Sequence, residues 1–339
     1  MGFELTRQIQ AEVLEQDFLT PLASGEWREI HTTHHTPHTI TGVQDAGPNT
    51  PISSDMTKRE LYLTLEKYGF GSCRTEIETW LRTEVLLSPN ESKYDNLPMG
   101  ATKQGGEPDL SPGTDWPKYS RRGVPGLRNT SKPITFLAQL RCTDLKPFAP
   151  AQFPDFGLLS FFAAIEQNTL VRDENEYPIG CVLFSTDYVE TLTRTPFPRA
   201  LYFGNRLAPC SLKVEASTGI GFEPLSEAIE CQFGYSQEME DRIWNLYSQE
   251  IIPTGRHKLF GSPSMLELDI PEEARLLAKT DESPENDTTV DWLLLLEFDL
   301  EDTPVDEGGR LYFMIHRDDL AACRFNKTLV LHDAQGRSS

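Results

Sequence analysis

The stretches Ile134-Thr-Phe-Leu-Ala-Gln-Leu140 and Gly157-Leu-Leu-Ser-Phe-Phe-Ala-Ala-Ile165 indicate the kind of fold that this chain adopts. Each is a short apolar or alternating run with the length of a β-strand. Four similar runs, bounded by Gly, Pro, Asp or Asn, are Cys181–Phe184, Trp292–Phe298, Leu311–His316 and Thr328–His332. Because regular helices do not alternate with these runs, a doubly wound parallel sheet is disfavoured. The sequence predicts a β-rich α+β fold, with mainly antiparallel sheets and a few flanking helices.

Capping signals predict the starts of helices at three places. Thr57-x-x-Glu60 and Thr75-x-x-Glu78 are capping boxes, in which a threonine and a glutamate three residues later satisfy free amides at a helix N-terminus. Ser236 is a suitable N-cap for a third helix, because apolar residues follow it at helical spacing.

Four segments differ in composition. Residues 1–56 form an N-terminal extension that we expect to be partly ordered, and residues 57–87 form a helical lead-in. The strand-rich pattern defines a domain over residues 88–333, and residues 334–339 are expected to be a disordered tail.

The bulk composition excludes several classes of protein. Hydrophobic residues make up 38% of the 339 residues, which is enough for a sizeable core. No apolar run approaches the ~20 residues that span a bilayer, and the N-terminus lacks a signal-peptide pattern, so we expect a cytoplasmic protein without membrane contact. The six cysteines are scattered singly, which indicates reduced thiols and neither a disulfide framework nor a zinc site.

Charge is unevenly distributed along this chain of net charge −21. Residues 267–307 contain fifteen acids and two bases, whereas residues 116–141 contain six bases and no acid. Nucleic-acid binding is disfavoured, because it depends on neutralising phosphates. The acidic run is either a solvated loop that favours solubility or a surface that attracts a basic protein partner. For the second interpretation, Glu285, Asp287 and Asp291 are the residues to test.

Six motifs, spread over about 240 residues and in a fixed order, resemble the YwqG-like family. They are Ser92-Lys93 with Gly105–Leu110 and Asp115–Pro117; Ile134–Leu140; Gly157–Phe162; His257–Pro263; Trp292–Asp299; and Asp306–Ile315 with Asp318–Leu320. Residues 94–104 form an insert relative to the family, and Ser160 and Glu297 stand where the family tends to have glutamine. Polar contacts at these two strands are therefore expected to differ.

The resemblance implies an α+β fold rich in antiparallel strands, which agrees with the strand pattern. It implies no established catalytic residue, cofactor or substrate, because the family is one of unknown function. Some members lie in bacterial genomic neighbourhoods with toxins, which hints at a role in immunity.

His31, His34, His35 and His38 are the candidate metal ligands. Their spacing would place all four on one helical face, and neutral imidazoles suit zinc, nickel or copper. The intervening threonines and Pro37 disfavour a helix, however, and as a strand only His34 and His38 would share a face. We therefore favour a polar segment without a metal, and expect no cofactor.

Five residues are candidates for ligand binding: Asp109, Trp116, Gln139, His257 and Asp306. All but Asp109 also have a structural interpretation. His257 is either a general base or an imidazole that satisfies backbone groups, and the aspartate before Gly308-Gly309 is either a ligand-binding carboxylate or a turn former. Gln139 either orients a ligand or pairs with backbone, and Trp116 either lines a cleft or closes the core edge.

Two functional hypotheses follow. The sequence lacks the Gly-x-Ser-x-Gly, His-Glu-x-x-His, Walker and dinucleotide signatures. We therefore favour a non-enzymatic binding protein that uses its acidic surface, in the context of toxin immunity. The alternative is an enzyme or small-ligand sensor whose cleft is lined by Trp116, Gln139, His257 and Asp306. A third interpretation is a scaffold whose N-terminal 56 residues carry the specificity.

Overall fold

The computed structural model describes residues 57–90, 97–120, 131–253, 256–278, 291–301 and 303–334. The extension predicted over residues 1–56 lies outside this part of the chain, as do residues 335–339 of the predicted tail. The described residues all belong to one compact unit that begins at Ser53.

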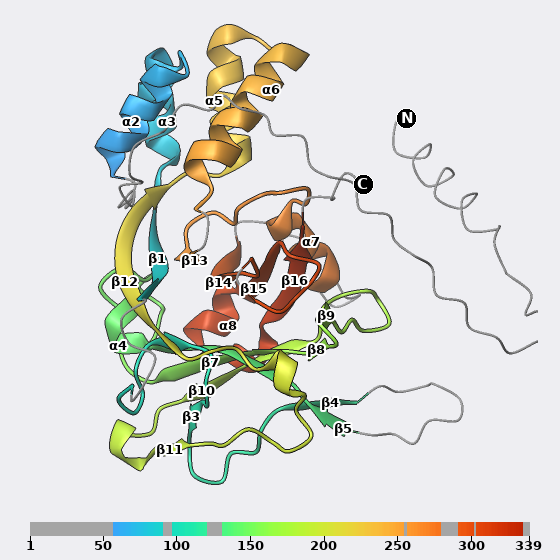
Figure 1. Ribbon diagram of the computed structural model, residues 1–339. Coiled ribbons are helices and arrows are strands. Elements are labelled where there is room, and N and C mark those ends of the chain that lie inside the picture. The colour runs from blue at the N-terminus through green and yellow to red at the C-terminus, as the bar shows by residue number, and fades with distance from the viewer. Residues whose placement is uncertain are drawn as a thin grey trace, which may run out of the picture. The chain divides into compact units, whose positions relative to one another are not determined.

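A ten-stranded antiparallel sheet forms the body of this unit, which confirms the predicted fold class (Figure 1). In spatial order its strands are β10 (Gly180–Ser185), β7 (Leu158–Ala163), β6 (Thr135–Arg141), β2 (Lys103–Gln104), β12 (Cys210–Gly219), β1 (Arg82–Asn90), β13 (His257–Phe260), β14 (Trp292–Asp299), β15 (Arg310–His316) and β16 (Leu329–Asp333). All six runs predicted as strands contribute to it. Three two-stranded pairs lie beside it: β3 (Asp109–Leu110) with β11 (Thr193–Arg194), β4 (Lys118–Ser120) with β5 (Ser131–Pro133), and β8 (Ile165–Glu166) with β9 (Thr169–Leu170).

The first strand of the chain lies near the middle of the sheet. β1 pairs with β12 from Arg82 to Asn90, and with β13 from Glu84 to Leu87. The helical lead-in expected up to residue 87 therefore ends earlier, because residues from Arg82 onward are strand. Val85 and Leu87 both point into the central core, because every second side chain of a strand lies on the same face.

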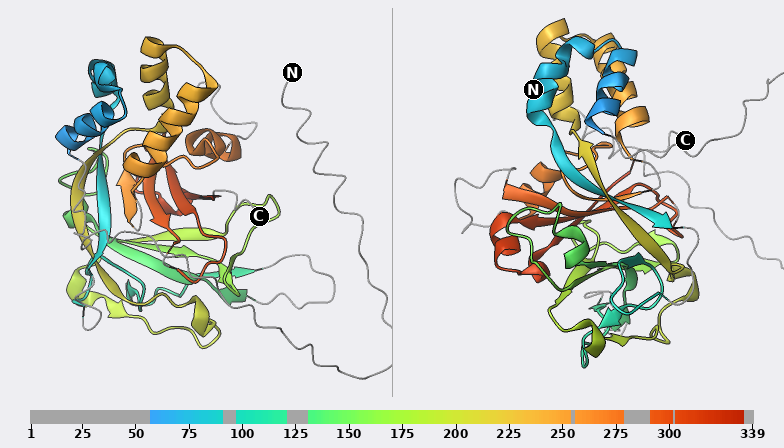
Figure 2. Two further views of the ribbon diagram at one scale, coloured as in Figure 1. Left: turned by 45° about the horizontal axis from the view of Figure 1, so that its top comes forward. Right: turned by 90° about the vertical axis from the view of Figure 1, so that its left-hand side faces the viewer.

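The sheet curls so strongly that its two edges approach each other (Figure 2). A Cβ added to Gly180 on β10 would lie 2.9 Å from a methyl carbon of Val330 on β16. Phe184 on β10 also packs against Phe325 beside β16, with ring centroids 4.7 Å apart. Curling brings side chains from distant strands together, so that the inner face can form one core.

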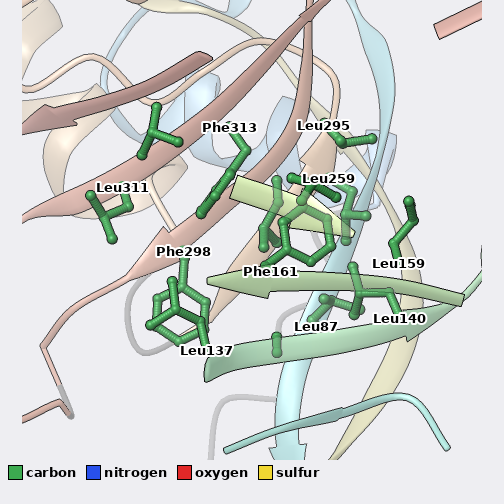
Figure 3. Close-up of a cluster of buried hydrophobic side chains, with 14 of the residues drawn as sticks. Leu87, Leu137, Leu140, Leu159, Phe161, Leu259, Leu295, Phe298, Leu311 and Phe313 are labelled. Carbon is green, nitrogen blue, oxygen red and sulfur yellow. The ribbon is translucent and has the colours of Figure 1, made fainter. Parts of the chain in front are cut away.

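That core is built from both halves of the sheet (Figure 3). Phe161 on β7 meets Phe313 on β15 edge to face, with centroids 5.1 Å apart. Leu137, Leu259 and Phe298 are fully buried in the same cluster. Burial of this apolar surface is the main driving force for closing the sheet.

The outer face of the sheet is also covered. Over β6 and β7, Trp116 packs on Phe162, and Phe197 packs on Trp116. Over β14, β15 and β16, α7 (Ile270–Ala278) places Ile270 and Ala274 against the sheet. β7 is consequently buried at every position, which explains its unbroken apolar sequence.

Four helices form a second cluster at one end of the sheet: α2 (Lys58–Lys67), α3 (Arg74–Trp80), α5 (Phe222–Phe233) and α6 (Gln237–Leu246). The capping box at Thr57 and the N-cap at Ser236 are confirmed. The expectation for Thr75 is wrong, because α3 starts one residue before it, after Cys73, and has no side-chain cap. The short elements are α4 (Cys142–Leu145), α8 (Arg317–Ala321), η1 (Gly71–Cys73), η2 (Val189–Thr191), η3 (Phe203–Asn205), the π-helical turn η4 (Tyr247–Ile251) and η6 (Phe325–Lys327).

Candidate functional site

A cleft of about 680 Å³ opens beside the C-terminal end of β13. Six segments that are distant in sequence line it: the start of β1, the loop after α4, the start of α5, the turn after β13, the start of α7 and the start of β14. Its volume lies in the range of clefts that bind small molecules or single side chains of a partner.

The turn after β13 has two consecutive residues with left-handed backbone. Phe260 has φ 58° and Gly261 has φ 64°. A bulky residue is rarely found there, and glycine is required at the next position because a Cβ would lie 2.9 Å from Cβ of Glu84. Strained backbone of this kind concentrates at binding sites, because surrounding contacts must hold it in place.

Side chains hold the next segment, residues 264–268, through five consecutive backbone amides. The N–H of Ser264 donates to Glu297 Oε2 at 2.8 Å, and the N–H of Met265 donates to the hydroxyl of Tyr247 at 3.2 Å. The next three amides, those of residues 266–268, donate to one carboxylate oxygen of Asp333 at 2.8–3.0 Å. Met265 and Leu268 line the cleft, so this wall is fixed to the sheet and is preorganised.

A buried ionic network lies beneath this wall. The ammonium of Lys258 is 3.3 Å from Glu297 and 3.8 Å from Glu84, and it donates to Ser264 Oγ at 2.9 Å. Arg310 pairs with the other oxygen of Glu297 and lies 3.2 Å from Asp299. Burial of Glu297 favours its neutral form, but Lys258, Arg310 and the Ser264 amide outweigh burial and lower its pKa to about 2. Burial raises the pKa of Glu84, against the opposing charge of Lys258.

The interior of the cleft is largely apolar. Phe148, Phe222, Phe260, Met265 and Trp292 contribute to its lining. The indole Nε1 of Trp292 is buried and has no hydrogen-bond partner among the described residues. Such a surface favours aromatic or aliphatic groups through the hydrophobic effect.

The charged groups of the cleft are Glu223, Asp269 and Arg82, which leaves one net negative charge. Partial burial, and then the nearby carboxylate of Asp269, raise the pKa of Glu223. The guanidinium of Arg82 instead donates to the carbonyls of Thr79 and Leu81, at 3.3 and 3.1 Å. Arg82 thus offsets one of the two carboxylates, and the net negative charge that is left favours a positively charged group in the cleft.

Asp109 and Gln139, two of the candidates for ligand binding, lie next to each other, but both are buried inside the protein. Gln139 is fully buried; its Nε2 donates to Asp109 Oδ2 at 2.8 Å, and its Oε1 accepts from the Asp109 N–H at 2.9 Å. Arg194 Nε donates to Asp109 Oδ1 at 2.9 Å, and Lys103 lies 3.8 Å from the same carboxylate. Burial lowers the pKa of Lys103 to about 8, although Asp109 opposes this shift. These contacts join β3 to β2, β6 and β11.

Trp116 and His257 are likewise buried. The indole N–H of Trp116 donates to the carbonyl of Ile134 at 2.8 Å, and the ring is buried. This environment agrees with the interpretation in which Trp116 closes the edge of the core. His257 stacks on Phe298 with centroids 4.0 Å apart. Its Nδ1 accepts from the Asp299 N–H at 3.1 Å, and its Nε2 is 2.6 Å from Gln104 Oε1, so the ring is neutral. Burial and then the charge of Arg310 lower its pKa to about 3.

Asp306 is exposed, and its N–H donates to the carbonyl of Asn168 at 2.8 Å. Gly308 and Gly309, which follow it, both have positive φ, as the turn interpretation requires. Trp116, Gln139, His257 and Asp306 thus have different surroundings, and none of them lines the cleft beside β13.

The acidic run is less uniform than its sequence indicates. Glu297 and Asp299 are buried in the ionic network, Glu307 pairs with Arg172 at 2.6 Å, and Asp291 lies 3.4 Å from Arg317. The unpaired charge therefore does not extend over the whole of residues 267–307. Glu285 and Asp287 lie outside the described residues.

The candidate metal ligands His31, His34, His35 and His38 also lie outside the described residues. In the described part of the chain, no group of three or more His, Cys, Asp and Glu side chains is placed to hold a metal ion. None of the described helices has the length and apolar character needed to cross a membrane.

Sequence inspection missed Glu223 and Asp269. A local signal exists for the second, because Asp269-Ile-Pro-Glu-Glu combines an N-cap aspartate, an early proline and acids in the first turn. The Asp269 carboxylate does accept from the Glu272 N–H at 3.1 Å. Because these residues lie within the acidic run 267–307, they were interpreted only as a source of negative charge and not as the start of a helix.

The fold and cleft define an α+β domain built on one curled antiparallel sheet. Residues 102–333 match the family described as Domain of unknown function (DUF1963), and the chain belongs to that family. The match starts downstream of β1, although β1 pairs with two strands inside it. A comparison with curated proteins found no match.

Proposed function

We propose that this protein is a binding protein without catalytic activity, and that its cleft beside β13 takes an apolar group carrying a positive charge. The observation that carries the proposal is the net negative charge left by Glu223, Asp269 and Arg82 at a cleft with an aromatic lining. An apolar body fits the aromatic lining, while an adjacent cation is attracted by the carboxylates.

The candidates for acid–base chemistry do not favour catalysis. A catalytic pKa should lie near the working pH, whereas His257 is neutral, fully packed and has a pKa of about 3. Lys258 and Glu297 neutralise each other away from the cleft lining. The alternative of an enzyme or sensor with a cleft at Trp116, Gln139, His257 and Asp306 therefore has less support than a binding role.

For a natural ligand, we propose a basic protein that inserts an apolar side chain next to lysine or arginine. The YwqG-like resemblance makes a toxin one candidate, with the present chain as an immunity protein in the cytoplasm. Glu285, Asp287 and Asp291 are proposed as further contacts of such a partner. Charge reversal of these three residues should then weaken partner binding, and an unchanged affinity would remove them from the proposed surface.

The cleft itself is tested with the peptide acetyl-Lys-Phe-Lys-amide and its acidic counterpart acetyl-Glu-Phe-Glu-amide. Isothermal titration should detect binding of the basic peptide only, with an affinity that falls as salt screens the charges. The double variant Glu223→Gln, Asp269→Asn should bind about tenfold more weakly, because each exposed charge pair contributes up to about 1 kcal/mol.

Glu227→Gln is the matched control. Glu227 is exposed on α5, one turn from Glu223, and it does not line the cleft. This variant should bind the basic peptide within about twofold of the unmodified protein. Equal binding of the acidic peptide, or an unchanged affinity in the double variant, would refute the proposal.

A further inference from the structure

A second surface has chemistry opposite to that of the cleft. Residues 191–214 contain four bases and no acid in a chain of net charge −21. Within them, the segment 196–206, here called the aromatic loop, exposes Tyr202 by 63% and Phe203 by 78%. Exposed aromatic side chains of this size, adjacent to each other, are typical of an interaction site.

Two arginines flank these aromatic residues. The Arg206 guanidinium lies 5.5 Å from the ring centroid of Phe203 and 4.8 Å from that of Phe197. Arg199 is exposed on the other side in sequence. The aromatic loop therefore presents apolar rings between positive charges, the same combination that the cleft is proposed to take.

The aromatic loop is held in place by the rest of the unit. The Thr195 N–H, at its start, donates to the carbonyl of Pro108 at 2.8 Å, and the carbonyl of Leu207, at its end, accepts from Gly106 at 2.9 Å. Phe197 packs on Trp116, with centroids 6.0 Å apart. β3 and β11, which anchor the loop, lie at the opposite end of the unit from α5 and α6 (Figures 1 and 2). The loop is thus fixed away from α5, whose N-terminal end lines the cleft.

We propose that the aromatic loop of one copy inserts Tyr202 and Phe203 into the cleft of a second copy, so that the chain self-associates head to tail. The proposal rests on the proposed ligand preference of the cleft. Charge complementarity supports it: Arg199 and Arg206 would approach Glu223 and Asp269. Anionic membranes and nucleic acids are poorer partners, because the chain as a whole repels them.

The geometry of such a contact predicts the kind of assembly. Loop and cleft are different surfaces, so the contact is heterologous and leaves one of each free at the ends of every open oligomer. Assemblies should therefore grow with protein concentration into rings or chains, and should not stop at a symmetric dimer.

The first experiment is sedimentation velocity of the full chain over a concentration series at physiological salt. The weight-average mass should rise with concentration, and Phe203→Ala should weaken association about tenfold or more, as for a central aromatic residue of an interface. Tyr188→Ala is the control, since Tyr188 is 81% exposed but lies outside the aromatic loop. A chain that stays monomeric throughout, or equal losses in both variants, would overturn the proposal.

The second experiment mixes two variants that each lack one surface. Tyr202→Ala, Phe203→Ala retains the cleft, and Glu223→Gln, Asp269→Asn retains the aromatic loop. Each alone should be largely monomeric, whereas their equimolar mixture should form dimers and stop there. Association of the loop variant with itself, or failure of the mixture to dimerise, would overturn the head-to-tail contact.

Two further outcomes separate the possible failures. If the monomeric chain binds the Lys-Phe-Lys peptide but never self-associates, only this inference fails and the proposed function stands. If the aromatic loop instead drives binding to phosphatidylserine vesicles without self-association, the surface has a lipid partner and the proposal is overturned.

Discussion

Mild acid should destabilise this protein through a single buried imidazole, that of His257. In the folded state its Nδ1 accepts a hydrogen bond from the Asp299 N–H, and its Nε2 lies 2.6 Å from Gln104 Oε1. Protonation would remove the first of these bonds and place a positive charge near Arg310. Burial and Arg310 accordingly lower the pKa of His257 from 6.5 to about 3.

The size of the effect follows from linkage. Because the folded pKa is depressed, the unfolded chain takes up a proton below pH 6.5 that the folded chain refuses until about pH 3. This contribution to stability is complete above pH 6.5 and is lost as the pH falls toward 3. Each pH unit in this window costs about 1.4 kcal/mol, so acidification from pH 7 to pH 5 should remove about 2 kcal/mol.

Urea unfolding at pH 7 and pH 5, followed by tryptophan fluorescence, measures this loss. His257→Gln retains a donor and an acceptor but cannot titrate, so its loss between the two pH values should be smaller by about 2 kcal/mol. Equal losses in the variant and the unmodified protein would refute the assignment of a neutral, buried imidazole.

Three other perturbations test the fold. Glu297→Gln should lower the free energy of unfolding by about 3–5 kcal/mol in urea titrations at pH 7, since it removes the buried carboxylate that pairs with both Lys258 and Arg310; a loss below about 1 kcal/mol would contradict the network. A chain of residues 91–339 should lack a cooperative thermal transition by circular dichroism, because it has no β1, and a sharp transition would show that β1 is dispensable. Gly105→Ala should lower the free energy of unfolding by about 2–5 kcal/mol in the same urea assay. The reason is that Gly105 has φ 60° and that a Cβ there would lie 2.2 Å from the carbonyl oxygen of Ala208. An unchanged urea midpoint would contradict this crowding.

The sequence was most informative where strands are buried on both faces. β7 and β14 are apolar at nearly every position, because the central core lies on one side and a second cluster on the other. β12 and β1 were not recognised. β12 is half exposed along its middle, so that its sequence, with Lys213 and Glu215, resembles a loop. β1 was taken as the end of a helical segment, since only pairing with β12 and β13 reveals it as a strand.

The site was harder to predict than the fold for a physical reason. A buried charge is stable only with partners from other segments, and sequence spacing does not show which ones. Lys258 and Glu297 illustrate this: each is polar in sequence, yet they face each other across paired strands and are almost fully buried. The cleft combines six segments, of which only the His257–Pro263 and Trp292–Asp299 motifs were singled out beforehand.

The central place of β1 has a consequence for synthesis. Its partners β12 and β13 end at Gly219 and Phe260, and residue 260 is 170 positions beyond residue 90, where β1 ends. At a translation rate of about 5–20 residues per second, both hydrogen-bonding edges of β1 stay open for roughly 6–26 s until β12 is complete, and the edge that pairs with β13 stays open for roughly 9–34 s. During that interval Val85-Leu-Leu87 can pair with any other nascent strand. Chaperones that bind extended apolar segments should therefore raise the yield of this protein more than its modest size alone would indicate.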